Sequence, residues 1–142
     1  MEELVSIGGL VDQSSVSLCL YGEDLDPNEV SSVLGVPGDR MHRRGDKRRE
    51  GTSPFQKGAW AILEEGSAPL GPEELLERIA ERVPTDPAIW AGLGRRFDLQ
   101  VRFGIHQSEW NRGFDLSQKS VRFLERIGAS LVFDIYCDGD AA

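Results

Sequence analysis

The chain has 142 residues and a formal net charge of −8, with 39% hydrophobic and 28% charged residues. This length fits one domain with a core of its own, and the composition is ordinary for a globular protein. The acidic balance argues against general nucleic-acid binding, and no apolar run approaches the roughly 20 residues that span a bilayer.

The N-terminal third is predicted to contain a tail, a strand and a short helix. Residues 1–13 lack periodicity and the basic start of a signal peptide, so we expect a flexible tail or weak lead-in strand of a cytoplasmic protein. Residues 15–21 alternate between polar and apolar side chains, as a half-buried strand does. Asp26 and Pro27 are a favoured helix cap and first helical residue, and Gly35 marks the end of that helix.

Residues 38–57 are predicted to form a long exposed loop that concentrates the positive charge. Six of the 16 Lys and Arg residues lie between Arg40 and Arg49. Residues 39–49 contribute +4, from six cations and two acids, which leaves −12 on the rest of the chain. One cationic loop on an acidic body is the charge pattern that a function has to explain.

The central segment is predicted to form a strand followed by two helices. The strand is GAWAILEE at 58–65, and a turn follows it. Pro72 opens a helix whose apolar residues recur at helical spacing, and Pro84 ends it. The pair Asp86–Pro87 repeats the cap-and-proline pattern at the start of the next helix.

The C-terminal third is predicted to form a strand, a helix and a strand. Residues 97–106 alternate again, and Ser117 or Asp115 is expected to cap a helix that ends at Gly128. The last strand is SLVFDIY at 130–136. Alternation puts three apolar side chains on one side of it, Leu131, Phe133 and Ile135.

Both ends of the chain therefore share the order strand, capped helix, strand. Right-handed crossovers would place both of these helices on one face of a single sheet. We predict an α+β fold, a ferredoxin-like βαβ–(αα)–βαβ sandwich with a four-stranded, mainly antiparallel sheet and helices on one face. The domain is expected to span residues 14–137, with a C-terminal tail at 138–142.

The sheet face turned away from the helices is predicted to be polar, because the alternation assigns mostly polar and aromatic side chains to it. By the same parity Cys19 and Cys137 fall on opposite faces, so no disulfide is predicted between them. The residues assigned to this open face are Cys19, Tyr21, Gln100, Arg102, His106, Asp134 and Tyr136.

Part of the sequence resembles a known bacterial family. The run LYGEDLDPNEVSSVLGVPGDRMHRRGD is followed by GAW at 58–60 and by LVFDIY at 131–136. Taken in this order, these elements resemble domain of unknown function family 4279 over roughly residues 15–136. The resemblance implies a small stand-alone bacterial domain and brings no established activity.

No motif indicates a catalytic centre, a metal site or a cofactor. The P-loop pattern and the usual metal-binding patterns are absent from the sequence. Glu23, Asp24 and Asp26 near a strand end could bind a metal or act in acid–base catalysis, but they also lie where a helix N-terminus favours negative charge, which is the preferred interpretation. His42 and His106 have no evident partner for proton transfer. The sequence therefore favours a non-enzyme without metal or cofactor.

The first functional hypothesis is a non-catalytic module that binds another protein. The charge of −12 outside residues 39–49 would suit a basic partner through electrostatic complementarity. An immunity-type inhibitor that blocks a basic toxin is one concrete form. No nucleic-acid or membrane partner is expected.

The second hypothesis is a binding domain or weak enzyme for a small ligand that carries phosphate or carboxylate. The basic stretch at residues 40–49 would bind it, because arginines in a glycine-punctuated loop can hold such an anion by paired hydrogen bonds. Alternatively, the loop pairs with the acidic body and binds nothing. The candidate ligand-binding residues are Tyr21, Arg43, Arg44, Asp46, Lys47, Arg102 and Tyr136.

Overall fold

The computed structural model describes residues 9–137, and the parts of the predicted tails at 1–8 and 138–142 lie outside them. In chain order the elements are β1 (Gly9–Leu10), β2 (Gln13–Gly22), α1 (Pro27–Leu34), β3 (Arg40–His42), β4 (Gly58–Ser67), α2 (Pro72–Arg82), α3 (Pro87–Arg96), β5 (Asp98–Gln107), β6 (Arg112–Gly113), α4 (Gln118–Ile127) and β7 (Ser130–Cys137). The helices and long strands match the sequence predictions. The short strands β3 and β6 lie in predicted loops, and β1 and β6 form a small parallel pair.

The main sheet has five strands in the order β3-β4-β2-β5-β7. β2 lies at its centre and runs antiparallel to both β4 and β5. β3 is antiparallel to β4, whereas β5 and β7 are parallel. The α+β class and the mainly antiparallel sheet are confirmed, but the four-stranded ferredoxin-like arrangement is not, because the sheet has a fifth strand.

The difference arises in the connection that follows α1. A βαβ crossover would bring the next strand back parallel to β2. Instead, α1 is followed by β3, which forms an antiparallel hairpin with β4. Residues 43–57 connect the two strands of this hairpin and form the basic loop. β4 therefore returns antiparallel to β2. The second unit, β5-α4-β7, is the predicted parallel crossover.

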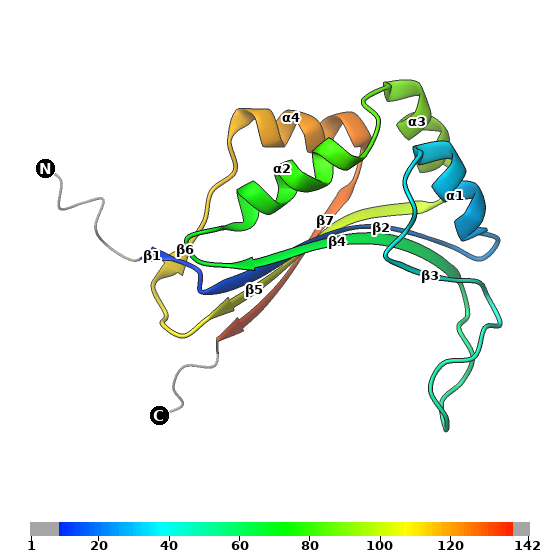
Figure 1. Cartoon of the computed structure of the whole chain (residues 1–142), viewed down its shortest axis with the longest axis horizontal. Coiled ribbons are helices and arrows are strands. Elements are labelled where there is room, and N and C mark those ends of the chain that lie inside the picture. The colour runs from blue at the N-terminus through cyan, green and yellow to red at the C-terminus, as the bar shows by residue number, and fades with distance from the viewer. Residues whose placement is uncertain (1–8, 138–142) are drawn as a thin grey trace, which may run out of the picture.

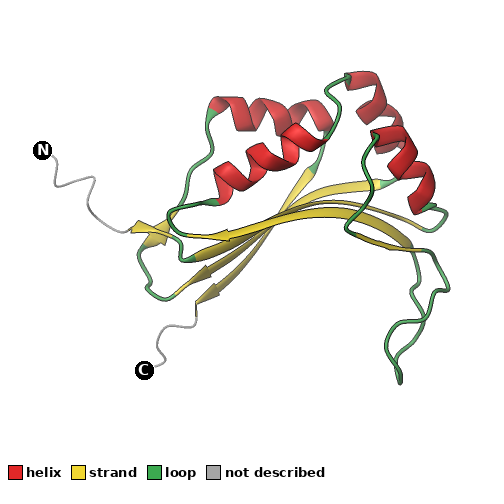
Figure 2. Ribbon diagram, viewed as in Figure 1, coloured by secondary structure: helices red, strands yellow, loops and turns green. Residues whose placement is uncertain are grey.

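The helices α1 to α4 cover one face of the sheet, as predicted (Figures 1 and 2). Asp26 caps α1 by accepting a 2.9 Å hydrogen bond from the amide of Asn28, and Ser117 caps α4 in the same way at 3.3 Å. Gly35 and Gly128 end these helices with φ angles of 74° and 70°, where a side chain would be strained. Within residues 9–137, no helix is long and apolar enough to cross a membrane.

The core lies between the sheet and the helices. Two of its largest fully buried side chains are Trp60 and Trp90. The Trp60 Nε1 donates to Ser31 Oγ at 3.0 Å, and the Trp90 Nε1 donates to the carbonyl of Pro84 at 2.9 Å. Each buried indole thus has the polar partner it needs, since an unmade buried hydrogen bond is costly.

The second face of the sheet carries the predicted polar residues. The strand register places Gln100 opposite Cys19 and Tyr136 opposite His106, so these side chains share one face. The helices lie on the other face (Figure 2). Both cysteines are free thiols, with Cys19 buried and Cys137 exposed, which agrees with the prediction of no disulfide between them.

Candidate functional site

The basic loop is held against an acidic turn of the same chain. Arg43 Nη2 lies 2.9 Å from the Oδ1 of Asp26, the residue that also caps α1. Arg44 lies 3.8 Å from a carboxylate oxygen of Glu23 and 3.9 Å from one of Asp24. These acids form the turn between β2 and α1. The loop is therefore paired with the acidic body, as one of the sequence hypotheses expects.

The basic loop is also folded within itself, and it projects from the sheet on the side away from the helices (Figure 1). Asp46 Oδ2 accepts a hydrogen bond from the amide of Arg43 at 2.8 Å, and the amide of Phe55 donates to the Asp46 carbonyl at 3.0 Å. Asp46 thus positions the loop backbone, which makes it a structural residue of the loop. Lys47 is exposed.

Arg102, the third arginine of the candidate ligand site, is bonded to neighbouring side chains on the open face. Its Nη1 donates to Gln100 Oε1 at 2.9 Å, and its Nη2 donates to Asp134 Oδ2 at 3.1 Å. Gln100 in turn donates to Asp98 Oδ2 at 3.0 Å. Arg102 therefore belongs to a polar ladder that joins β5 to β7.

The two candidate tyrosines lie at opposite ends of the open face. Tyr21 is opposite Asp98 and Tyr136 is opposite His106, so they are separated by eight residues along β5. At strand spacing this corresponds to about 27 Å. Tyr21 is partly buried, and this burial is the main cause that raises its pKa to about 12. The structure does not bring Tyr136 together with Tyr21 and the basic loop around one small ligand.

The two histidines are also far apart, and each stacks on an aromatic ring. The ring centroids of His42 and Phe55 are 3.4 Å apart, and those of His106 and Tyr136 are 4.8 Å apart. Neither histidine is hydrogen-bonded to a carboxylate among the described residues. Within residues 9–137, no group of three or more His, Cys, Asp or Glu side chains could hold a metal ion.

The two edges of the main sheet differ in length and chemistry. β3 has three residues, includes Arg40 and continues into the basic loop. β7 has eight residues and contains Asp134 as its one charge, with no Lys or Pro; within residues 9–137 it pairs with β5 alone. Its apolar row is exposed on the helix side of the sheet. The exposed fractions are 42% for Leu131, 46% for Phe133 and 62% for Ile135.

The edge of β7 was not identified from the sequence as a candidate binding surface. The alternation of Leu131, Phe133 and Ile135 is the same for a central strand as for an edge strand, so periodicity cannot show their exposure. The available signal is the chemistry of the strand. An edge strand that lacks Lys, Pro and a bulge is a template for pairing with another chain.

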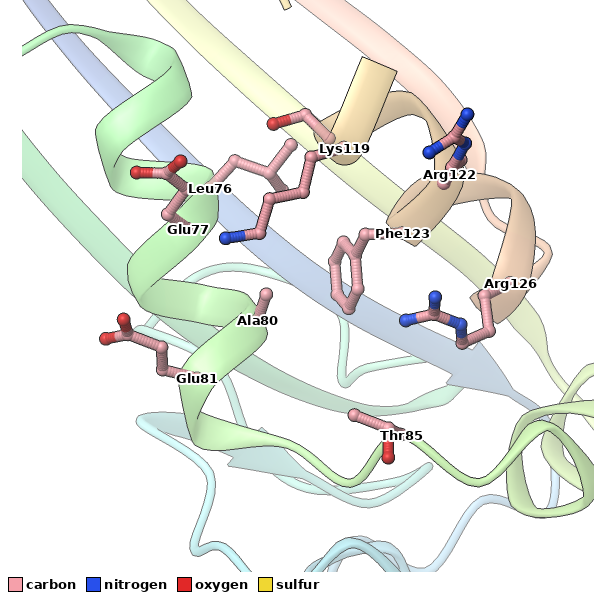
Figure 3. Close-up of a pocket in the computed structure, with 10 residues that line it drawn as sticks. Leu76, Glu77, Ala80, Glu81, Thr85, Lys119, Arg122, Phe123 and Arg126 are labelled. Carbon is pink, nitrogen blue, oxygen red and sulfur yellow. The ribbon is translucent and has the colours of Figure 1, made fainter. Parts of the chain in front are cut away.

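A groove of about 470 Å³ lies between α2 and α4 (Figure 3). Glu77 and Glu81 come from α2, whereas Arg122 and Arg126 come from α4, and Phe123 lies between the two walls. The groove is therefore acidic on one side and basic on the other. No ion pair joins these two walls among the described residues.

Glu73 joins α2 to the N-terminal end of α4. Its Oε1 accepts a 2.7 Å hydrogen bond from the amide of Ser117 and a 2.9 Å hydrogen bond from the hydroxyl of Ser120. The bond from the Ser117 amide is the main reason why the pKa of Glu73 is lowered from its ordinary value. This contact helps to fix the two helices that border the groove.

Comparison with known proteins places the chain in a family. The family model described as a domain of unknown function (DUF4279) matches residues 12–138, which is most of the chain. No curated protein and no solved structure matches it. The chain therefore belongs to the DUF4279 family of domains of unknown function.

Proposed function

We propose that this chain is a non-catalytic protein-interaction module of the bacterial cytoplasm, and that the outer edge of β7 is its binding surface. The observation that carries the proposal is the contrast between the two sheet edges. Native sheets protect exposed edges with short strands, Lys or Pro, bulges or covering elements. β3 is short, contains Arg40 and leads into the basic loop, whereas β7 has eight residues, no Lys or Pro, and Asp134 as its one charge, which is paired with Arg102 of the same chain.

The edge of β7 offers backbone and side-chain interactions together. When a strand is added to a sheet, main-chain hydrogen bonds supply affinity and alternate side chains supply specificity. On its outer side β7 has no strand partner in the described part of the chain. Phe133 and Ile135 are 46% and 62% exposed on the helix side of this strand, so a partner that covers them removes apolar surface from water.

A site for a small anionic ligand has weaker support. Arg43, Arg44 and Arg102 each lie beside a carboxylate of the same chain, so an incoming anion would have to displace these contacts. Tyr136 lies at the other end of the sheet from the basic loop. An immunity-type inhibitor of a basic toxin is one form of the proposed module; the charge of −12 outside residues 39–49 supports that form through the rest of the surface, since the one acid of β7 is paired with Arg102.

Site-specific photo-cross-linking in the producing cells tests the proposal. A photoreactive residue at Ile135 should give a defined adduct whose protein component mass spectrometry identifies. The matched control is Val33 on α1, which is also apolar and 40% exposed. The same residue at Val33 should give no such adduct. Equal adducts from both positions, or none from Ile135, would overturn the proposal.

A further inference from the structure

We infer that the partner of β7 is the β7 strand of a second copy of this chain, paired antiparallel around Phe133; this inference rests on the proposed function. The two copies are related by a two-fold axis perpendicular to the sheet at Phe133. Each residue of one strand then lies opposite the residue of the other strand that is equally far from Phe133 in the opposite direction along the chain. β7 forms one border of the sheet (Figure 1), so the two five-stranded sheets join into one. The helices of both copies then lie on the same face.

The side chains of β7 match each other in this register. Leu131 of one copy faces Ile135 of the other, and the two Phe133 rings face each other across the axis. All of these side chains lie on the helix side, where each is now 42–62% exposed. Phe133 already stacks on Phe103 with centroids 5.0 Å apart, so its counterpart extends an existing aromatic cluster.

Neighbouring registers of the same symmetry fit less well. A centre at Asp134 would place two carboxylates directly opposite each other, which is destabilising. A centre at Val132 would set Ile135 and Tyr136 opposite residues 129 and 128, which lie before β7 begins. The register around Phe133 pairs residues 130–136 of one strand with the same residues of the other.

Charge complementarity at the edge favours a neutral partner over a basic one. Asp134 is the one charged residue of β7, and Arg102 of the same copy neutralises it at 3.1 Å. A basic strand would therefore find no free carboxylate on β7. A second β7 brings an apolar row in the required alternation and leaves both Arg102–Asp134 pairs in place.

The size of the contact predicts a weak dimer. β7 has eight residues, whereas stable interfaces use roughly 20–30 residues on each side. Each copy also carries a net charge of −8, which opposes association at long range. Association should therefore increase with protein concentration, and it should increase with salt, because salt screens the repulsion between copies.

Sedimentation velocity on the full chain, under reducing conditions, gives the first test. The wild type should change from monomer to dimer over a concentration series. Ile135→Lys should raise the dissociation constant by about tenfold or more, since it buries an unpaired charge beside the axis. Val33→Lys, with the same change on α1, should behave as the wild type. A wild type that stays monomeric, or equal effects of both variants, would overturn the inference.

Cysteine cross-linking gives a second test that is specific for the register. In a Cys137→Ser background, Phe133→Cys should form a disulfide dimer on mild oxidation, because directly opposed residues are within disulfide reach. Ile135→Cys is the matched control. The two introduced thiols would lie four residues apart along the strands, so this variant should form no disulfide dimer. Cross-linking from Ile135→Cys but not from Phe133→Cys would overturn the register.

The two proposals can fail separately. If the chain is monomeric but the photoreactive residue at Ile135 captures a different, identified protein, the second copy is wrong and the interaction module stands. If the chain is monomeric and Ile135 captures nothing, both are wrong.

Discussion

The basic loop allows a direct test of whether its arginines are structural. We predict that the double variant Arg43→Ala/Arg44→Ala is less stable than the wild type. We also predict that it binds anions no more weakly than the wild type does. Both guanidiniums lie within ion-pair distance of the acidic turn before α1. Removing them breaks these contacts while Asp26 can still cap the helix, because its bond to the Asn28 amide is independent of the loop.

The magnitude follows from distance and exposure. The pair Arg43–Asp26 is close, at 2.9 Å, but both side chains are about half exposed. Arg44 makes longer contacts of 3.8 and 3.9 Å to more exposed acids. Exposed pairs contribute about 0.2–1 kcal/mol each, so the double variant should lose about 1 kcal/mol. For a domain of this size that corresponds to a decrease in Tm of about 4 °C.

Thermal unfolding with and without a panel of phosphates, nucleotides and dicarboxylates measures both effects. Lys47→Ala/Arg49→Ala is the matched control, because it removes the same charge from the same loop at residues that form no ion pair within the described part of the chain. Its Tm should be unchanged, and high salt should shrink the deficit of the first variant. An anion that stabilises the wild type but not the first variant would refute the reasoning.

The remaining predictions concern a hydrogen bond in the core, the loss of stability at acidic pH, and the ionisation of Tyr21. Ser31→Ala leaves the buried indole N–H of Trp60 without an acceptor and should lower the free energy of unfolding by about 1–3 kcal/mol in urea titrations. The lowered pKa of Glu73 means that its contribution is present above its ordinary pKa of 4.5 and is lost as pH falls below it. Glu73→Gln should therefore be less stable at neutral pH and should lose less stability on acidification, as followed by urea midpoints against pH. The pKa of Tyr21, raised to about 12, should delay one tyrosinate absorbance step, and Tyr21→Phe should remove that step. The same shift makes stability decline as pH rises from the ordinary value of 10.0 towards 12.

Local signals predicted the individual elements well. The pair Asp26–Pro27 and the stop at Gly35 set the limits of α1, because capping is decided by a few adjacent residues. The order of the strands was not predictable in this way. β3 has three residues within a charged segment, too few to show an alternation, yet its pairing with β4 turns the expected crossover into a hairpin.

For the candidate site too, local features were predictable and features set by long-range strand pairing were not. Parity along the strands predicted which side chains share the open face, since alternation is a local property. The separation of Tyr21 from Tyr136 depends on how β2 and β7 register against β5. The exposure of Phe133 depends on β7 being the last strand of the sheet that the described residues form. Both are set by long-range pairing, which a single sequence does not show.

Backbone amide hydrogen exchange on β7 tests the central claim most directly. It should be measured on the full chain in dilute and in concentrated solution, with β3 as the internal comparison. If the edge of β7 pairs with a second copy, the amides of residues 130–136 that point away from β5 should exchange more slowly in the concentrated sample, while those of β3 stay unchanged. Equal exchange of β7 at both concentrations would contradict the account.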